Sequence, residues 1–281
     1  MKNIIVTNAD RDGYGAHKEN IFIARNEAGR HLGTLLIFPY LDFDIEPEHP
    51  HNLSLYLHPD GGKEISEPVK DLLLDYAMRR ANEIKQEAGQ PQTRVYACYQ
   101  SHQQEEIAYF LQRGFTHDEG MHIYERNDPT LPPRPVAPEE VSIQEWKMET
   151  EAERRRFLEA HRLVFPRHAY SIESLQELMA LPGWCNYVAF GDSEIAGNVM
   201  LFTKTADNTI GYIEDLFVQK QWRRRGIGRR LLYTALAHFQ AASVYRVQLE
   251  FWSANKPGLR LYSEFGFTSI AETEIAVGRY V

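Results

Sequence analysis

Hydrophobic residues follow two spacings along the chain, one typical of helices and one typical of strands, and segments of the two kinds alternate. Apolar residues three and four positions apart predict a helix over residues 68–87, which begins with a proline, and a shorter helix over residues 105–113. Runs that alternate, or that are rich in β-branched and aromatic residues, predict strands. In this part of the chain the predicted strands are residues 4–7, 21–25, 31–40, 53–57 and 94–99. The mixture predicts an α/β protein with α+β character, built on a mixed sheet.

The second part of the chain shows a similar order of elements. The predicted strands are residues 141–146, 187–191, 194–205 and 212–218, and the predicted helices are residues 150–164, 171–179 and 227–239. Residues 101–115 align over residues 253–267 without a gap. This internal repeat predicts two similar folds in tandem, and a chance likeness of two α/β segments is the alternative.

Five prolines separate the two parts, at positions 129, 132, 133, 135 and 138. Such a run favours an extended, semi-rigid spacer. We therefore predict a domain over residues 1–127, a proline-rich linker over residues 128–140 and a second domain over residues 141–281. A proline-rich ligand for a partner protein is the alternative for the linker.

A glycine- and arginine-rich loop follows the predicted strand 212–218 and opens the next helix. It reads Arg-Arg-Arg-Gly-Ile-Gly-Arg over residues 223–229. Glycines let the backbone bend so that several N–H groups point to one place, and a helix N-terminus adds partial positive charge there. The loop lacks the Lys-Ser or Lys-Thr of a P-loop and the third glycine of a dinucleotide fingerprint. It therefore predicts a pyrophosphate site, and a solvated arginine run is the alternative.

Two motifs carry a resemblance to a known family. Arg-x-x-Gly-x-Gly from Arg223 to Gly228 resembles the acyl-CoA-binding motif of the GNAT acetyltransferases. Further on, Asn255, Tyr262 and the pair Gly266-Phe267 resemble the second motif of that family. The resemblance covers residues 141–281 and implies two tandem GNAT-like acyl-CoA acyltransferase folds.

The resemblance also implies a cofactor and a set of site residues. Acetyl-CoA would be the co-substrate, with no metal and no covalent enzyme intermediate. Its expected binding residues are Leu216, Phe217, Val218, Arg223, Arg224, Arg225, Gly226, Ile227, Gly228, Arg229 and Asn255. Tyr262 is the expected general acid, with its hydroxyl near the sulfur of coenzyme A.

The general base is expected on the predicted strand 212–218. Strand alternation would send the side chains of Glu214 and Asp215 to opposite faces, so that only one of them faces the acceptor. The sequence Glu-Asp-Leu-Phe-Val is similar to the polyamine acetyltransferases, in which the first carboxylate is the base. We therefore predict Glu214, with Asp215 as the alternative. The non-catalytic alternative is that this carboxylate only pairs with an arginine or caps a turn.

The first domain lacks the residues that this chemistry needs. In the repeat alignment Gln103 stands opposite Asn255, and Phe110 stands opposite Tyr262. No Arg-x-x-Gly-x-Gly follows Leu57, and the front of this domain is too short for the two helices that usually shape the acceptor site. We therefore predict a degenerate, structural domain. In the second domain Phe165, His168, Tyr170 and Trp184 are candidates either for the acceptor pocket or for the core.

Composition limits the possible partners. The chain has 281 residues, 43% of them hydrophobic and 25% charged, and a net charge of −8 that lies mostly in residues 1–127. A local arginine cluster on an acidic protein suits a small anion better than a nucleic acid. We expect no membrane segment, no signal peptide and no disulfide, and hence a cytoplasmic protein. The histidines around residues 49–58 lack the spacing of metal ligands, so a surface loop is expected there.

Two functional hypotheses remain. The first is an acetyl-CoA-dependent N-acetyltransferase that acts on a small amine, a peptide N-terminus or a lysine. The second is a non-catalytic acyl-CoA-binding or regulatory module. The presence of Glu214, Asn255 and Tyr262 together favours the enzyme, because a module that only binds needs neither a base nor an acid.

Overall fold

The computed structural model describes residues 3–42, 50–59, 64–136, 138–166, 168–204 and 209–281. They form two compact units. Unit 1 consists of Met1–Met121, Trp252–Asn255 and Glu272–Val281, and unit 2 of His122–Phe251 and Lys256–Ala271. The units therefore differ from the two predicted halves of the sequence, because residues 272–281 lie in unit 1.

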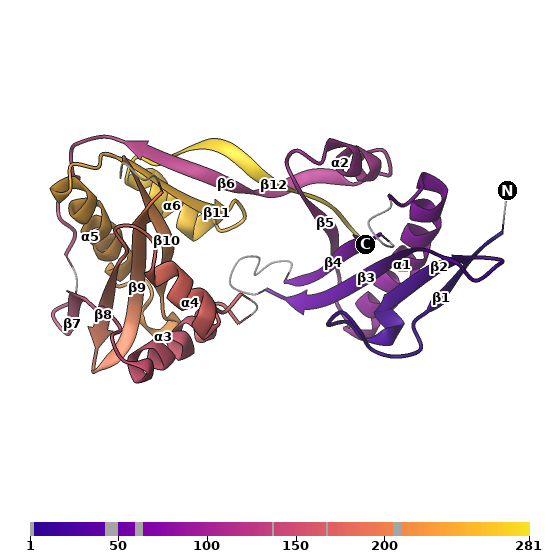
Figure 1. Cartoon of the computed structure of the whole chain (residues 1–281), viewed down its shortest axis with the longest axis horizontal. Coiled ribbons are helices and arrows are strands. Elements are labelled where there is room, and N and C mark those ends of the chain that lie inside the picture. Colours follow the sequence, from indigo (N-terminus) through magenta and orange to yellow (C-terminus); the bar gives the residue numbers. More distant parts are fainter. Residues whose placement is uncertain (1–2, 43–49, 60–63, 137, 167, 205–208) are drawn as a thin grey trace. The chain divides into compact units, whose positions relative to one another are not determined.

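Unit 1 is built on antiparallel strands that end in one parallel pair (Figure 1). Its elements are β1 (Ile4–Asn8), the 3₁₀-helix η1 (Lys18–Asn20), β2 (Ile21–Asn26), β3 (His31–Leu41), β4 (His51–His58), α1 (Glu67–Glu87), β5 (Arg94–Gln100), α2 (Gln104–Leu111) and part of β6 (Thr116–Asn127). Strands β1 to β4 are antiparallel neighbours, and β5 runs parallel to β4. The end of β12 (Thr268–Tyr280), the last strand of the chain, pairs antiparallel with β5.

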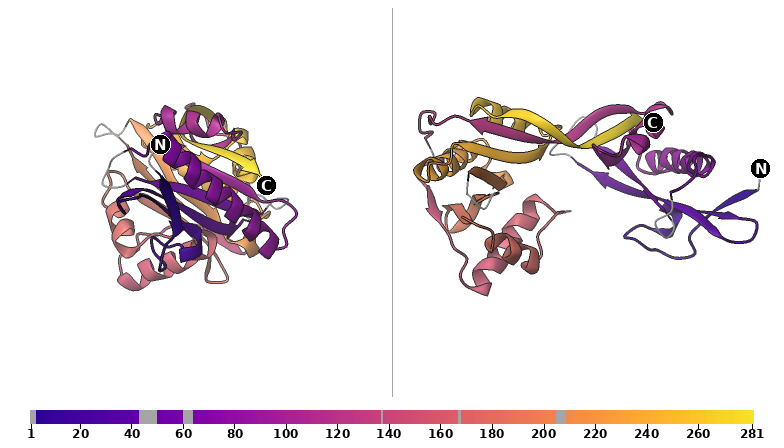
Figure 2. Two further views of the ribbon diagram at one scale, coloured as in Figure 1. Left: turned by 90° about the vertical axis from the view of Figure 1, so that its right-hand side faces the viewer. Right: turned by 45° about the horizontal axis from the view of Figure 1, so that its top comes forward.

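Helix α1 covers one face of this sheet and supplies much of its core (Figure 2). A proline in its first turn fits the free N–H position there. Leu73, Ala77 and Ala81 follow at helical spacing and are completely buried against Leu35 and Val95 of the strands. Burial of a leucine side chain such as Leu73 stabilises the fold by about 1.5–3 kcal/mol.

Unit 2 has helices on both faces of its sheet. Its elements are the end of β6, β7 (Val141–Glu145), α3 (Glu151–Val164), α4 (Ile172–Met179), β8 (Cys185–Gly191), β9 (Glu194–Thr203), β10 (Ile210–Val218), the 3₁₀-helix η2 (Lys220–Trp222), α5 (Ile227–Ala241), β11 (Arg246–Trp252, all but its last residue), α6 (Lys256–Glu264) and the first part of β12. Strands β7 to β10 are antiparallel neighbours, and β11 runs parallel to β10. Helix α5 packs with one core, and α3 and α4 pack with a second core on the other face.

The element orders of the two units confirm the predicted mixed α/β fold and its repeat. Strand β4, α1, β5, α2 and β6 follow one another as β10, α5, β11, α6 and β12 do. The strand order is β1-β2-β3-β4-β5-β12 in unit 1 and β12-β6-β11-β10-β9-β8-β7 in unit 2, with β12 divided between the two units. One difference bears on function: between its first two strands unit 1 carries only η1, where unit 2 carries α3 and α4.

Candidate active site

Strands β10 and β11 of unit 2 pair only at their beginnings. Their parallel register runs from Ile210 and Arg246 to Ile213 and Leu249, although β10 continues to Val218. On its other side β10 stays paired with β9 through Val218. Among the described residues, no strand pairs with the β11 side of residues 216–218. Such an open strand edge can bond an extended chain as an added strand would.

A β-bulge lies at Glu214, inside this strand. Ile213 pairs with Leu201 of β9, and Asp215 pairs with the next residue, Met200, so Glu214 is the extra residue between them. The bulge overturns the expectation that the side chains of Glu214 and Asp215 lie on opposite faces. Both meet groups from the α3 and α4 side of the sheet, as the following contacts show.

Glu214 is partly buried and accepts a hydrogen bond from the loop that precedes α4. The hydroxyl of Tyr170 donates to Oε1 of Glu214 at 3.3 Å. Burial raises the pKa of Glu214, and the charge of Glu250 adds to the rise, whereas the bond from Tyr170 and the charge of Lys204 oppose it. A carboxylate with a raised pKa that reaches the surface is a suitable general base.

Asp215 is buried next to a histidine of α3. Its Oδ2 atom lies 3.7 Å from Nε2 of His161, and the two side chains are 6% and 3% exposed. Burial raises the pKa of Asp215 to about 8, with a further rise from the charge of Glu214, and burial lowers the pKa of His161 to about 4. Near neutral pH the Asp215 carboxyl therefore holds a proton, and the imidazole is neutral.

The aromatic candidates of the sequence lie in different surroundings. The ring of Tyr170 stacks on His161 with 4.3 Å between the centroids, and the ring of Phe165 lies 4.9 Å from His161. Trp184 packs at the margin of the α3 and α4 core, and His168 is exposed. Tyr170 is among the residues that the sequence analysis gives as candidates either for the acceptor pocket or for the core. His161 is not among them, because nothing in the pattern of α3 links this histidine to β10.

Tyr262 lies on α6 with its ring inside the core of α5 and β11. The ring is 9% exposed and lies 4.9 Å from the ring of Phe251. Its hydroxyl makes no hydrogen bond within the part of the chain that the structure describes. Burial raises the pKa of Tyr262, and Asp215 adds to the rise. The phenol therefore stays protonated across the neutral range and keeps a hydrogen bond to donate.

The glycine-rich loop leaves the N-terminus of α5 without a side-chain cap. Gly226, the residue before the helix, has a left-handed backbone with φ of 82°, and no side chain bonds the first N–H groups. In contrast, α3 and α4 both begin with capping boxes, at Thr150 and Ser171. The free N–H groups of α5 and the helix dipole form a ready site for an anion.

The arginines of this loop have different roles. Arg223 donates from Nε to the carbonyl of Val218 at 3.1 Å, which ties the loop to the end of β10. Arg225 pairs with Glu140 at 3.5 Å, and Arg229 pairs with Glu264 at 2.5 Å. Arg224 is exposed, with a φ of 66°. Exposed ion pairs contribute little, so Arg225 and Arg229 can turn to a bound anion at small cost.

Asn255 is the residue before the first turn of α6, and its N–H bonds the carbonyl of Trp252 at 3.0 Å. Its counterpart Gln103 likewise precedes α2, and Phe110 is completely buried at the position of Tyr262. Gln103 and Phe110 therefore lie at the positions just before and within α2 that the repeat alignment assigns to them, and the first domain has no phenol at the second of these positions.

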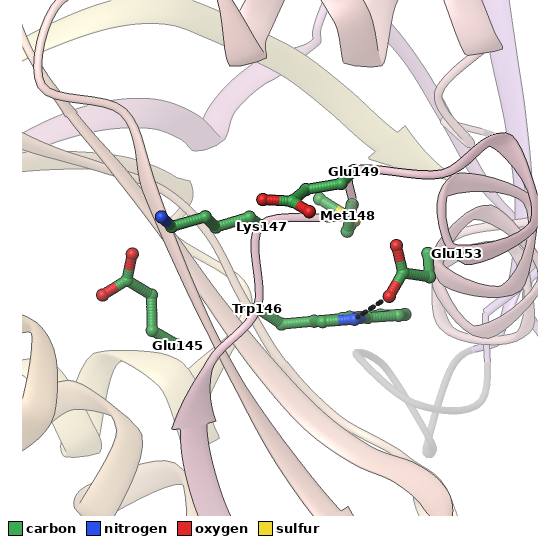
Figure 3. Close-up of a pocket in the computed structure, with 6 residues that line it drawn as sticks. All are labelled: Glu145, Trp146, Lys147, Met148, Glu149 and Glu153. Atoms are coloured by element: carbon green, nitrogen blue, oxygen red, sulfur yellow. Dashed lines mark hydrogen bonds between the residues drawn. The ribbon is translucent and has the colours of Figure 1, made fainter.

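A depression of about 440 Å³ lies elsewhere in unit 2, at the start of α3 (Figure 3). Its lining residues are Glu145, Trp146, Lys147, Met148, Glu149 and Glu153. Nε1 of Trp146 donates to Oε1 of Glu153 at 3.1 Å, and Glu153 also closes the capping box of α3. None of the predicted site residues lines this depression, so it is separate from the candidate active site.

The structure adds three observations on the other expectations. Within the described ranges, no three histidine, cysteine or acidic side chains come together as metal ligands could. Of the predicted histidine-rich loop, residues 43–49 lie outside the description, while His51 is buried and bonds Thr93. A search of the described helices found none with the length and apolar character that a membrane span requires.

The site thus combines a pair of parallel strands that separate after Ile213 and Leu249 with an uncapped helix that follows a glycine. Residues 144–267 match the family model described as Acetyltransferase (GNAT) family. The second half of the chain is therefore similar to this family.

Comparisons with a curated protein and with solved structures found further similarities. Mycothiol acetyltransferase from Thermobispora bispora is 29% identical over 148 residues, which are 48% of this chain and 49% of that protein. The chain thus spans about half the length of this curated relative. A GCN5-related N-acetyltransferase from Sphaerobacter thermophilus shares the fold over 95% of this chain and 82% of its own, with a TM-score of 0.51 and 17% identity. A tandem GNAT protein from the clavulanic acid biosynthesis pathway aligns over 92% of this chain and 82% of its own, with a TM-score of 0.46 and 15% identity.

Proposed function

We propose that the second half of the chain, residues 141–281, is an acetyl-CoA-dependent N-acetyltransferase that acts on a primary amine by direct attack. The observation that carries the proposal is the position of Glu214. It lies on the bulge where β10 leaves β11, half-buried and hydrogen-bonded by Tyr170, directly before the open edge of residues 216–218.

The proposed seat of acetyl-CoA extends from that edge to α5. Backbone groups of Leu216, Phe217 and Val218 would hold the pantetheine arm, and Asn255 would bond it further along. The pyrophosphate would lie on the uncapped start of α5, between Arg223 and Arg229. The available N–H groups and the exposed guanidinium groups fit an anion of this size.

In the proposed reaction Glu214 takes a proton from the ammonium group of the acceptor. The freed amine attacks the thioester carbonyl carbon, and the carbon–sulfur bond breaks as the amide forms and its nitrogen releases a second proton to solvent. Tyr262 donates its proton to the departing thiolate and regains one from solvent, and Glu214 later releases its proton to solvent, so that one proton is released in the whole reaction. Burial raises the pKa of the Cys185 thiol to about 11, so this cysteine would not be a nucleophile.

Glu214 is a better candidate for the base than Asp215. Asp215 is wholly buried and faces His161, so a substrate amine could not reach it without a change in the core. Glu214 keeps part of its surface exposed. We therefore propose Glu214 as the base, and Asp215 would act only indirectly, through its contact with His161.

We further propose that the first domain, residues 1–127, is structural. It lacks the phenol, because Phe110 stands at the position of Tyr262, and between its first two strands it carries η1 where the second domain carries α3 and α4. The same proposal includes a proline-rich linker over residues 128–140 and a cytoplasmic location. The acceptor would be a small amine, a peptide N-terminus or a lysine.

A panel of amines with acetyl-CoA, followed by release of free thiol, tests the proposal. We expect turnover with at least one amine and loss of that turnover in Glu214→Gln. If acetyl-CoA binds but no amine releases thiol, the second hypothesis, a non-catalytic acyl-CoA-binding or regulatory module, takes its place.

A further inference from the structure

Four side chains form a connected group on the α3 and α4 side of β10. Asp215 lies 3.7 Å from Nε2 of His161, the His161 ring stacks on Tyr170, and Tyr170 bonds Glu214 at 3.3 Å. Two of the four are almost wholly buried, and Tyr170 and Glu214 lie nearer the surface. The group therefore runs from the core to the proposed base.

Stacking fixes the plane of the Tyr170 ring. The two rings are inclined by only 22° with 4.3 Å between the centroids, which is contact distance. The His161 ring cannot turn freely, because Phe157, Phe165 and Phe217 surround it. The hydroxyl of Tyr170 is therefore held toward Glu214, although Tyr170 itself belongs to a loop before α4.

We propose that Tyr170 is a positioning residue for the carboxylate of Glu214 and is held in place by the buried pair His161 and Asp215. The proposal rests on the proposed function insofar as Glu214 is the base. A hydrogen bond to the ionised carboxylate favours its charged form and fixes its direction. The other charged groups that act on Glu214 are Glu250, which opposes ionisation, and Lys204, which favours it.

Tyr170→Phe separates this role from simple packing. The variant keeps the ring and its stack on His161 but deletes the donor. The matched control is Tyr187→Phe in the same unit, whose hydroxyl bonds Nδ1 of His238 at 3.1 Å, on the α5 side of the sheet. The readout is the pKa of Glu214 itself, from carboxyl-labelled glutamate in an NMR titration with Glu214→Gln to assign the signal.

We expect Tyr170→Phe to raise the pKa of Glu214 by about 0.5–1 unit, the size of one lost hydrogen bond, and Tyr187→Phe to leave it unchanged. With an active acceptor, the acidic limb of kcat/KM should move to higher pH by the same amount, with the KM for acetyl-CoA unaltered. A Glu214 pKa that is equal in wild type and Tyr170→Phe overturns the proposal. Because the titration needs no substrate, an enzyme without turnover would defeat the proposed function and leave this test intact.

A second test examines whether His161 holds Tyr170 in place. His161→Leu removes the stack, and the double variant with Tyr170→Phe measures the coupling. If His161 acts through Tyr170, His161→Leu should change the Glu214 pKa in the wild-type background and not in the Tyr170→Phe background. Equal changes in both backgrounds would show that His161 acts independently and would refute this part.

Discussion

Nε2 of His161 and Oδ2 of Asp215 lie 3.7 Å apart in a part of unit 2 that is almost closed to solvent. Each partner alone would be costly to ionise there. One proton on the Asp215 carboxyl, with a neutral His161, removes both charges. The protonation of this pair therefore links the stability of unit 2 to pH.

The first prediction concerns that link. Burial raises the pKa of Asp215 from 3.8 to about 8, so the folded state holds a proton that the unfolded chain has already lost. This carboxyl therefore makes folding less favourable as pH rises from about 4 to about 8, and the effect is constant above that. Asp215→Asn carries no such proton and should gain about 1 kcal/mol or more over the wild type between about pH 6.5 and about pH 8.

Urea unfolding of both proteins at the two pH values measures this gain. Asp192→Asn, which changes an exposed turn residue of the same unit, is the control and should show no such trend. A variant that becomes less stable than the wild type at the higher pH would mean that Asp215 is ionised and paired with a protonated His161.

The second prediction concerns the start of α5. Gly228→Asp places a carboxylate among the free N–H groups, and we expect acetyl-CoA binding to weaken by about 2 kcal/mol or more. A Cβ at this position would meet Leu261 and Val218 at 3.6 Å, an ordinary contact, so the variant should fold. Gly228→Ala, which adds the Cβ without the charge, should bind much more tightly than Gly228→Asp in calorimetry. Equal affinity of wild type and Gly228→Asp would remove the pyrophosphate from this loop.

The third prediction concerns Tyr262. Tyr262→Phe should bind acetyl-CoA nearly as the wild type does, while kcat falls by about 10²-fold or more, the scale of one proton-transfer group. Because the hydroxyl makes no hydrogen bond to any described residue, its removal should leave the unfolding temperature almost unchanged. Single-turnover and steady-state rates, with Tyr187→Phe as the control, give the comparison. A wild-type kcat in Tyr262→Phe would rule out the acid role.

The fourth prediction concerns Glu214. Glu214→Gln should lose most activity at pH values just above the acidic limb of kcat/KM, where Glu214 is ionised and the acceptor amine is still protonated and needs the base. The loss should shrink as rising pH deprotonates the amine without help. Profiles of kcat/KM against pH for wild type and variant show this convergence. A loss of the same size at every pH would indicate that Glu214 binds the acceptor and does not take its proton.

The fifth prediction concerns stoichiometry. Calorimetry with acetyl-CoA should give one site per chain, because unit 1 lacks the arginine- and glycine-rich loop after β4. Gly228→Asp should weaken binding at that one site, as the second prediction states. Two equivalent sites in the wild type would contradict the degenerate assignment of the first domain.

Much of this arrangement could be predicted from the sequence, because its signals are local. Helical spacing predicts α1 and α5, and the glycine-rich loop stands out as a run of neighbouring residues. The bulge at Glu214 could not be predicted, since one extra residue in a strand leaves the alternating pattern almost unchanged. The contact of His161 with Asp215 joins a helix to a distant strand, and no spacing within either element indicates it. Residues 272–281 lie within the predicted second domain, residues 141–281, and no local pattern in the sequence indicates that they belong to unit 1.

The pairing of β12 with β5 has a consequence for how the protein is made. A ribosome releases the chain from its N-terminus, so β5 emerges long before its neighbour, which runs from Glu274 to Tyr280 in this pair. Until residues 274–280 have been synthesised, the nascent first domain lacks the strand that pairs with β5. A fragment cut at the proline-rich linker would keep the same edge of β5 unpaired. Residues 272–281 added as a separate peptide should pair with this edge and complete the sheet of the first domain.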